Sequence, residues 1–73
     1  MPFKPVVNYN HHQQTASLNW DISHGMDCYP AVDVYINMDG SLTKIIPNGI
    51  TLIDKNTLRI SFSEEQAGVA RLV

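Results

Sequence analysis

The sequence predicts an all-β protein: a small antiparallel β-sandwich or barrel of about six to seven short strands, preceded by an extended N-terminal arm. Apolar and polar residues alternate in several short runs, as half-buried strands require. Turn-forming clusters separate these runs, at spacings of roughly 8–12 residues that are typical of sandwiches and barrels. No segment carries the sustained i, i+3, i+4 apolar pattern of an amphipathic helix.

The clearest alternation lies in the segment 51–63. Leu58, Ile60 and Phe62 fall on one face, and polar residues fall between them. A polar cluster at 54–56 is suited to a turn, and a second apolar run, 50–53, precedes it. We therefore expect a hairpin that places Leu58, Ile60 and Phe62 in the core.

The other expected strands follow the same rule. The segment 17–23 is expected to place Leu18, Trp20 and Ile22 on one face, and the segment 31–36 to place Val32, Val34 and Ile36 inward. The segment 42–46 is a further expected strand. In the last expected strand, 69–73, Ala70 and Leu72 point inward. Gly25 suits a turn after the first of these strands. Asp39-Gly40 tolerates the positive φ of a tight hairpin, and the segment 47–49 is a further turn.

The segment 1–16 shows no periodicity, and Pro2 and Pro5 favour extended backbone. We divide the chain into this arm, 1–16, and a β-sandwich domain, 17–73. The arm has two interpretations: a disordered terminus, or a segment that orders on a partner. In the second interpretation four apolar side chains are the contacts: Phe3, Val6, Val7 and Tyr9.

Composition limits the classes of partner. A chain of 73 residues forms one domain, which is marginally stable alone, and its lone cysteine, Cys28, excludes an internal disulfide. Net charge is −2 and the few cations are scattered, so we expect no nucleic-acid binding. No apolar run approaches a membrane span and no signal peptide is visible, so we expect no membrane partner. The lone cysteine and the absence of an Asn-x-Ser/Thr sequon fit synthesis in a reducing cytoplasm. With 44% hydrophobic and 16% charged residues, part of the surface is expected to lie against another subunit.

Possible metal ligands are few and irregularly spaced. His11, His12, His24 and Cys28 do not form the two close pairs of a structural zinc site, and adjacent histidines on an extended segment point opposite ways. His24 is better explained as a turn residue whose ring caps backbone groups, and Cys28 as a small buried hydrophobe. The segment 37–40 resembles part of a calcium loop, but the first and last ligand positions of that loop are not met. We expect no metal and no other cofactor.

Catalysis is not expected either. Asp21, His24 and Ser23 or Cys28 could be arranged as orienter, base and nucleophile, but no Gly-x-Ser-x-Gly motif is present. A domain of this size also has little volume for a substrate pocket. We therefore expect a protein that is not an enzyme and has no catalytic residues.

Aromatic residues are the remaining candidates for recognition. Trp20 shares its face with Leu18 and Ile22, which favours core packing. Tyr35 falls on the outward face of its strand and is a candidate partner contact. Tyr29, in the loop before that strand, could join Tyr35 in one exposed patch.

The order of residues from Trp20 onward carries a resemblance. The pattern comprises Trp20-x-Ile22-x-His24-Gly25-Met26, Tyr29-Pro30-Ala31-Val32-x-Val34, Ile53-Asp54-x-Asn56-Thr57-Leu58-x-Ile60-x-Phe62-Ser63 and Gly68-x-Ala70-x-Leu72. Over about two-thirds of the chain this is similar to a small β-sandwich module of tailed-bacteriophage virion proteins, especially tail-fibre and other appendage proteins. Gly25-Met26 stands where Asn-Leu is usual. The resemblance implies a structural role in the virion and no active site.

The module normally belongs to a longer protein, whereas here it follows Met1 and a short arm. We therefore expect a capsid decoration (cement) subunit or another small accessory protein, made in the host cytoplasm and located in the virion. Its partners would be the major capsid protein or other virion subunits, and it would form a homotrimer or another homo-oligomer. One alternative is a tail-fibre or receptor- or glycan-binding appendage module. Another is a regulatory domain stabilised by a metal.

Overall fold

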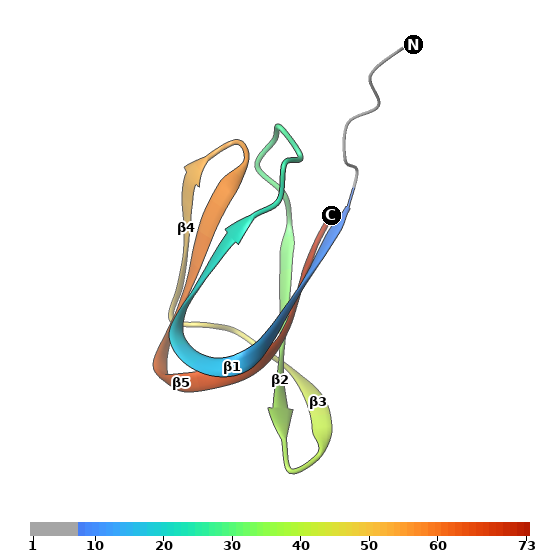
Figure 1. Ribbon diagram of the computed structural model, residues 1–73, viewed down its shortest axis with the longest axis vertical. Coiled ribbons are helices and arrows are strands. Elements are labelled where there is room, and N and C mark those ends of the chain that lie inside the picture. The colour runs from blue at the N-terminus through green and yellow to red at the C-terminus, as the bar shows by residue number, and fades with distance from the viewer. Residues whose placement is uncertain (1–7) are drawn as a thin grey trace.

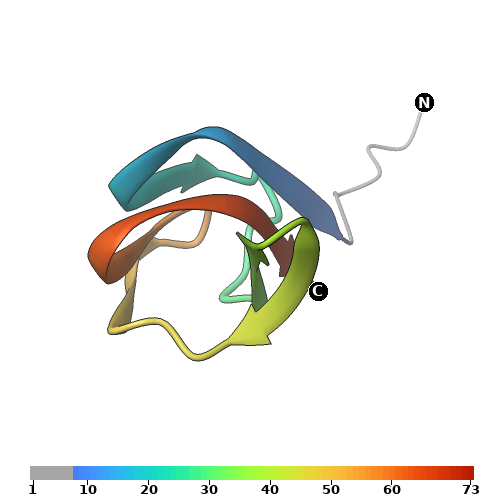
Figure 2. The ribbon, with the colours of Figure 1, turned by 90° about the horizontal axis from the view of Figure 1, so that it is seen from below.

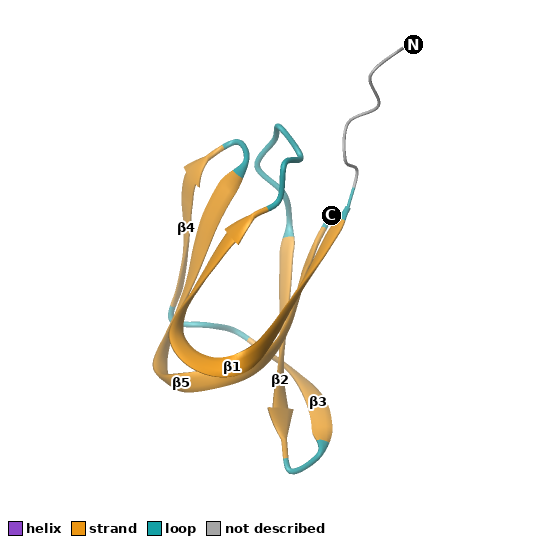
Figure 3. Ribbon diagram, viewed as in Figure 1, coloured by secondary structure: helices purple, strands orange, loops and turns teal. Residues whose placement is uncertain are grey.

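The computed structural model describes residues 8–73 and is all-β (Figure 1, Figure 3). Five strands form one antiparallel sheet, and the described residues contain no helix. The strands are β1 (Tyr9–Ser23), β2 (Val32–Met38), β3 (Ser41–Ile45), β4 (Gly49–Asp54) and β5 (Thr57–Leu72). The expected contact residues Phe3, Val6 and Val7 lie outside the described residues.

Strand β5 is the centre of the sheet. One edge of β5 pairs with β1 over nearly its whole length, from Thr57 opposite Ser23 to Leu72 opposite Tyr9. Its other edge is shared, because β4 pairs with the first half of β5 and β2 pairs with the second half. Strand β3 pairs with β2, and the part of the chain described here shows no pairing between β3 and β4. Seen from below, the sheet curls round, and the link from β3 to β4 crosses its open side (Figure 2).

Strand β1 bends sharply in its middle. Its pairing with β5 shifts register between Gln13 and Ser17, and again between Ser17 and Asn19. Such bulges bend a strand and increase its twist. The bend brings the rings of His11 and Trp20, on the same strand, to a centroid distance of 5.9 Å. The two halves of the sheet therefore face each other across the core, and β1 and β5 run side by side through the bend (Figure 1).

The core lies inside this fold of the sheet. Its buried apolar members are Trp20, Ile22, Met26, Val34, Ile36, Leu58, Ile60, Phe62, Ala70 and Leu72. Trp20 is fully buried and its ring lies 4.7 Å from that of Phe62, centroid to centroid. The Trp20 indole N–H donates to the backbone oxygen of Gln66 at 2.9 Å, so the buried polar atom of this side chain is satisfied.

These observations confirm the all-β class and the inward faces expected for the strands at 31–36, 57–63 and 69–73. The expected number of strands is not confirmed. Residues 64–68 remain in β conformation, so the two segments expected as separate strands form the single strand β5, and residues 8–73 contain five strands. All five strands belong to one sheet, so six to seven strands in a sandwich or barrel are not confirmed.

The start of the first strand also differs from the prediction. β1 begins at Tyr9 rather than Ser17, so residues 9–16 of the expected arm belong to a strand, and residues 9–13 of them pair with β5. Polar residues occupy both faces of this segment, so the sequence shows no alternation of apolar and polar residues. The period of two is visible only in the structure, where half-buried and exposed residues alternate. Leu18 is exposed rather than inward, because it lies between the shifted pairs at Ser17 and Asn19, where the alternation of faces is interrupted.

Two turns behave as their sequences predict. Asp39 and Gly40 have φ values of 52° and 85° and connect β2 to β3 between Met38 and Ser41, as in a two-residue type I′ hairpin. In the β4–β5 turn, the Asp54 carboxylate accepts the Asn56 backbone N–H at 2.8 Å. Both hairpins are thus fixed by local chemistry.

The loop between β1 and β2 is held against the β4–β5 turn. The backbone N–H of His24 donates to the Asn56 oxygen at 2.8 Å, and that of Cys28 donates to the Lys55 oxygen at 2.9 Å. The Asn56 side-chain oxygen accepts the Asp27 N–H at 2.8 Å. Met26, at the centre of this loop, is buried and covers one end of the core.

Candidate binding surfaces

A shallow depression lies on the outer face of the sheet, the face opposite the core. We call it the outer hollow; its lining comprises Asn10 and His12 of β1, Tyr35 of β2, Leu42 of β3, and Val69 and Arg71 of β5. Val69 lies between His12 and Tyr35 across the three adjacent strands. The volume of the hollow is about 470 Å³, and the hollow is open to solvent rather than enclosed. Four strands therefore converge on one open site with an apolar floor and polar margins.

Charges around the outer hollow are partly paired. The Lys44 ammonium lies 3.2 Å from the Asp33 carboxylate, on the neighbouring strands β3 and β2. Arg71 lies opposite Asp33 in the β2–β5 register, yet it makes no ion pair with any of the residues 8–73. Its guanidinium therefore remains available at the margin of the hollow.

A second surface follows the edge of the sheet at β4. We call it the β4 edge and define it as Ile46, Ile50, Leu52 and Ile53, all exposed. Ile50 lies opposite the fully buried Ile60, yet 38% of Ile50 is exposed. Leu52 likewise is 46% exposed, although its partner on β5 belongs to the core. The inner, apolar face of the sheet therefore continues past the core and reaches solvent at β4.

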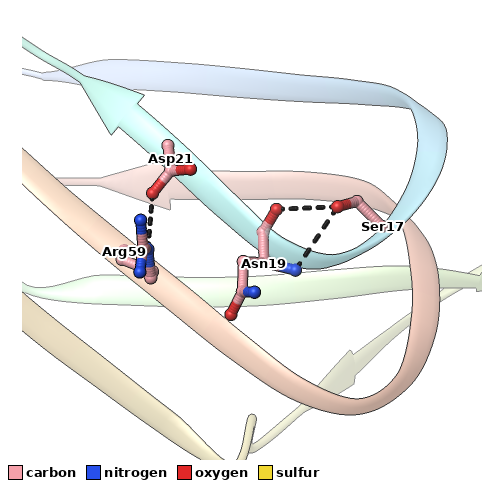
Figure 4. A network of polar contacts seen from close by, with 4 residues as sticks. All are labelled: Ser17, Asn19, Asp21 and Arg59. Carbon is pink, nitrogen blue, oxygen red and sulfur yellow. Dashed lines mark hydrogen bonds and ion pairs between the residues drawn. The ribbon is translucent and has the colours of Figure 1, made fainter.

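The outer face near the bend of β1 carries polar contacts that satisfy one another (Figure 4). Arg59 donates to the Asp21 carboxylate at 2.6 Å, across the β1–β5 pair. The Ser17 hydroxyl donates to the Asn19 oxygen at 2.9 Å and accepts the Asn19 N–H at 3.4 Å. Because these groups have partners, this region is a weaker candidate for ligand binding than the outer hollow.

The possible metal ligands are spread over the fold. His11 hydrogen-bonds Gln13 at 2.7 Å on the inner side of β1, whereas His12 lines the outer hollow on the other side. Within residues 8–73, no three His, Cys, Asp or Glu side chains are placed to hold a metal ion together. Cys28 is exposed, so its interpretation as a buried hydrophobe is wrong; the loop is held by backbone bonds and buries Met26 instead.

His24 performs the capping role that its turn position predicts. It is buried, and its Nδ1 accepts the Met26 backbone N–H at 3.1 Å. The accepting nitrogen carries no proton, so in the neutral ring Nε2 is protonated. Nε2 has no hydrogen-bond partner among the described residues. His24 thus fixes the loop that covers the core, with one ring nitrogen in contact with the backbone.

The structure separates the aromatic residues expected to contact a partner. Tyr35 lines the outer hollow, whereas Tyr29 is exposed on the loop before β2 and is not part of the hollow. Tyr9 is partly buried against the core, which limits its use as a partner contact. Trp20 is in the core, as expected.

Sequence reasoning missed most of the outer hollow and the β4 edge. Apart from Tyr35, the hollow-lining residues become neighbours only through the pairing of β1 and β2 with β5. The available signal was alternation: Val69 and Arg71 occupy the outward positions that alternate with the inward Ala70 and Leu72.

Comparison with known protein families, curated proteins and solved structures finds no match to this chain. Within residues 8–73, no helix is long and apolar enough to cross a membrane. Functional inference therefore depends on the two surfaces and on the resemblance described above.

Proposed function

We propose that this chain is a structural protein of a tailed-bacteriophage virion, and specifically a capsid decoration subunit that binds the head lattice and stabilises it. The observation that carries the proposal is the β4 edge, where the inner apolar face of the sheet is open to solvent. Exposed apolar surface of this kind favours protein association. The partner would be the major capsid protein or another virion subunit, and the mechanism would be binding without catalysis.

Several physical features support a subunit that functions in an assembly. Fully burying one Ile or Leu side chain contributes ~1.5–3 kcal/mol, and the β4 edge presents four such side chains that are between 38% and 95% exposed. Association costs at least ~4 kcal/mol, so one small contact gives weak binding. Repeated contacts on a lattice, or in a homotrimer or other homo-oligomer, would compensate for this through multivalency.

The sandwich or barrel architecture implied by the resemblance is part of this proposal. The bend of β1 and β5 places the two halves of one sheet face to face, as the layers of a sandwich would be. The unpaired region between β3 and β4 is where a barrel would have to close. A partner strand or subunit at the β4 edge would cover this open side.

The experiment is co-sedimentation of the purified full-length chain with capsids that lack it. The test variant is the double substitution Ile46→Ser with Ile53→Ser, because Ile46 is 95% exposed and neither side chain belongs to the core. The matched control is Leu42→Ser, which removes an apolar side chain that is 61% exposed on the outer face. We expect the double variant to bind at least tenfold more weakly, a loss of ~1.4 kcal/mol, and the control to bind as the parent does. Equal binding by all three proteins, or no sedimentation of the parent, would contradict the proposal.

We also propose that the segment 1–7 contributes apolar contacts through Phe3, Val6 and Val7. Residues 9–13 pair with β5, so a truncation that tests this must end before Asn8. A chain lacking residues 2–7 should retain its β-type circular dichroism and thermal stability while its capsid binding weakens. If the truncated chain binds capsids as tightly as the parent, the N-terminal segment has no such role.

A second candidate function is a receptor- or glycan-binding module of a tail fibre or another appendage. The outer hollow, with Tyr35 on its floor, favours this alternative. A glycan array tests this second function and capsid co-sedimentation tests the first, so the two are decided by separate measurements.

A further inference from the structure

The lining of the outer hollow is divided by chemistry. Val69, Leu42 and the ring of Tyr35 form an apolar floor, and Val69 and Tyr35 are half-buried. Asn10 and Arg71 lie opposite each other on β1 and β5, so an amide and a guanidinium both line one end of the hollow. The site therefore offers a flat apolar surface beside directional hydrogen-bond donors.

The cation at that end favours an anionic ligand. Arg71 has no ion-pair partner among the described residues, because the nearby Asp33 carboxylate is bound by Lys44 at 3.2 Å. A guanidinium presents a planar pair of N–H donors that matches the two oxygens of a carboxylate. The carboxylate is thus the group that would best use what Arg71 offers.

The form of the hollow favours a ring that lies flat. It is open and shallow, so it suits a ligand with one apolar face and polar edges rather than one enclosed on all sides. The C–H groups of a pyranose ring carry partial positive charge and pack on the negative face of an aromatic ring, such as that of Tyr35. The hydroxyl groups at the rim of such a sugar would reach Asn10 and His12.

We propose that the outer hollow binds an acidic sugar of the uronic acid type. Its carboxylate would bind Arg71, its ring would cover Tyr35 and Leu42, and its hydroxyls would hydrogen-bond Asn10 and His12. This site shares no residue with the β4 edge, so the inference is independent of capsid docking; it rests on the glycan-binding alternative and names the class of sugar for it. An acidic peptide is the competing ligand, because it also carries carboxylates, but it lacks the flat ring that the floor accommodates.

The experiment follows backbone amide resonances of the ¹⁵N-labelled full-length chain. The chain is titrated separately with galacturonate, with galactose, and with N-acetyl-aspartate amide as a mimic of an acidic peptide. We expect galacturonate to shift resonances on β1, β2, β3 and β5 around the hollow, with a Kd on the order of 1 mM, and galactose to bind at least tenfold more weakly. Equal shifts with galactose, shifts located elsewhere, no shifts, or stronger binding of the peptide mimic would each overturn the proposal.

Two substitutions locate the carboxylate. Arg71→Gln removes the charge from an exposed side chain and should abolish the preference for galacturonate over galactose. Lys55→Gln is the matched control, because it removes an exposed cation from the β4–β5 turn, outside the hollow, and should change nothing. If Arg71→Gln has the melting temperature of the parent and still prefers galacturonate over galactose, the proposed role of Arg71 is overturned. Capsid co-sedimentation of Arg71→Gln should match that of the parent, so failure of this site and failure of capsid docking give different results.

Discussion

Gly68 occupies a position in β5 that a larger residue can fill only if the backbone moves. A Cβ atom added there would collide with the backbone oxygen of Tyr35 and lie 2.8 Å from the Cα of Ile36. Both obstacles are main-chain atoms of β2, so no side-chain rotation relieves the contact. Gly68 therefore permits the close approach of β2 and β5 on which one wall of the outer hollow depends.

Gly68→Ala should accordingly destabilise the protein by about 2 kcal/mol, in the range observed for overpacked interiors, and lower the melting temperature by roughly 10 °C. Gly49→Ala is the matched control, because a Cβ at Gly49 meets nothing within 4 Å. Thermal unfolding followed by circular dichroism measures both. If Gly68→Ala has the same melting temperature as the Gly49→Ala control, β2 and β5 can separate at little cost in free energy.

Single strands were predicted well where one face is apolar, and poorly where it is not. The alternation of Leu58, Ile60 and Phe62 predicted the first half of β5, and the positive φ values of Asp39 and Gly40 agree with the predicted hairpin. The start of β1 was not predictable in this way, because its inner face there carries Tyr9, His11 and Gln13 rather than aliphatic residues. That segment is a strand because it pairs with β5. This interaction is non-local, so the sequence pattern within β1 cannot predict it.

The continuity of β5 was missed for a related reason. Residues 64–68 are polar or small and end in glycine, which is typical of a turn. In the structure they continue the strand through the bend, and the backbone oxygen of Gln66 accepts the Trp20 indole N–H. The outer hollow depends on this continuity, so it could not be predicted before the pairing was known.

The loop between β1 and β2 should depend on one side chain of the β4–β5 turn. Asn56→Ala removes the acceptor of the Asp27 N–H, so we expect a loss of about 1 kcal/mol and faster hydrogen exchange at the Asp27 amide. Asn48→Ala is the control, because Asn48 donates its backbone N–H, which the substitution keeps, to the Ser61 oxygen. If the Asp27 amide exchanges as slowly in Asn56→Ala as in the parent, the loop is held by its backbone hydrogen bonds to Lys55 and Asn56 alone.

For the molecule as a whole, stability should not depend on a metal. The described residues bring no three candidate ligands together, and the buried His24 uses Nδ1 to accept a backbone N–H. We therefore expect the same melting temperature with a chelator, with added zinc and with neither. A ligand that binds only the folded state raises the melting temperature as its concentration increases. A rise with zinc would thus favour the metal-stabilised regulatory domain considered above.

The pairing of β1 with β5 has a consequence for how the chain folds during synthesis. β1 is the first described strand to leave the ribosome, and β5, its partner in the sheet, is the last. Pairs so distant in sequence form slowly, because the intervening loop must close before any contact compensates for its entropy. Until β5 emerges, the strand that carries Trp20 and Ile22 has no partner strand among those described, and its apolar face is available to other nascent chains. The yield of native protein should therefore depend on competition between closure of this one pair and aggregation.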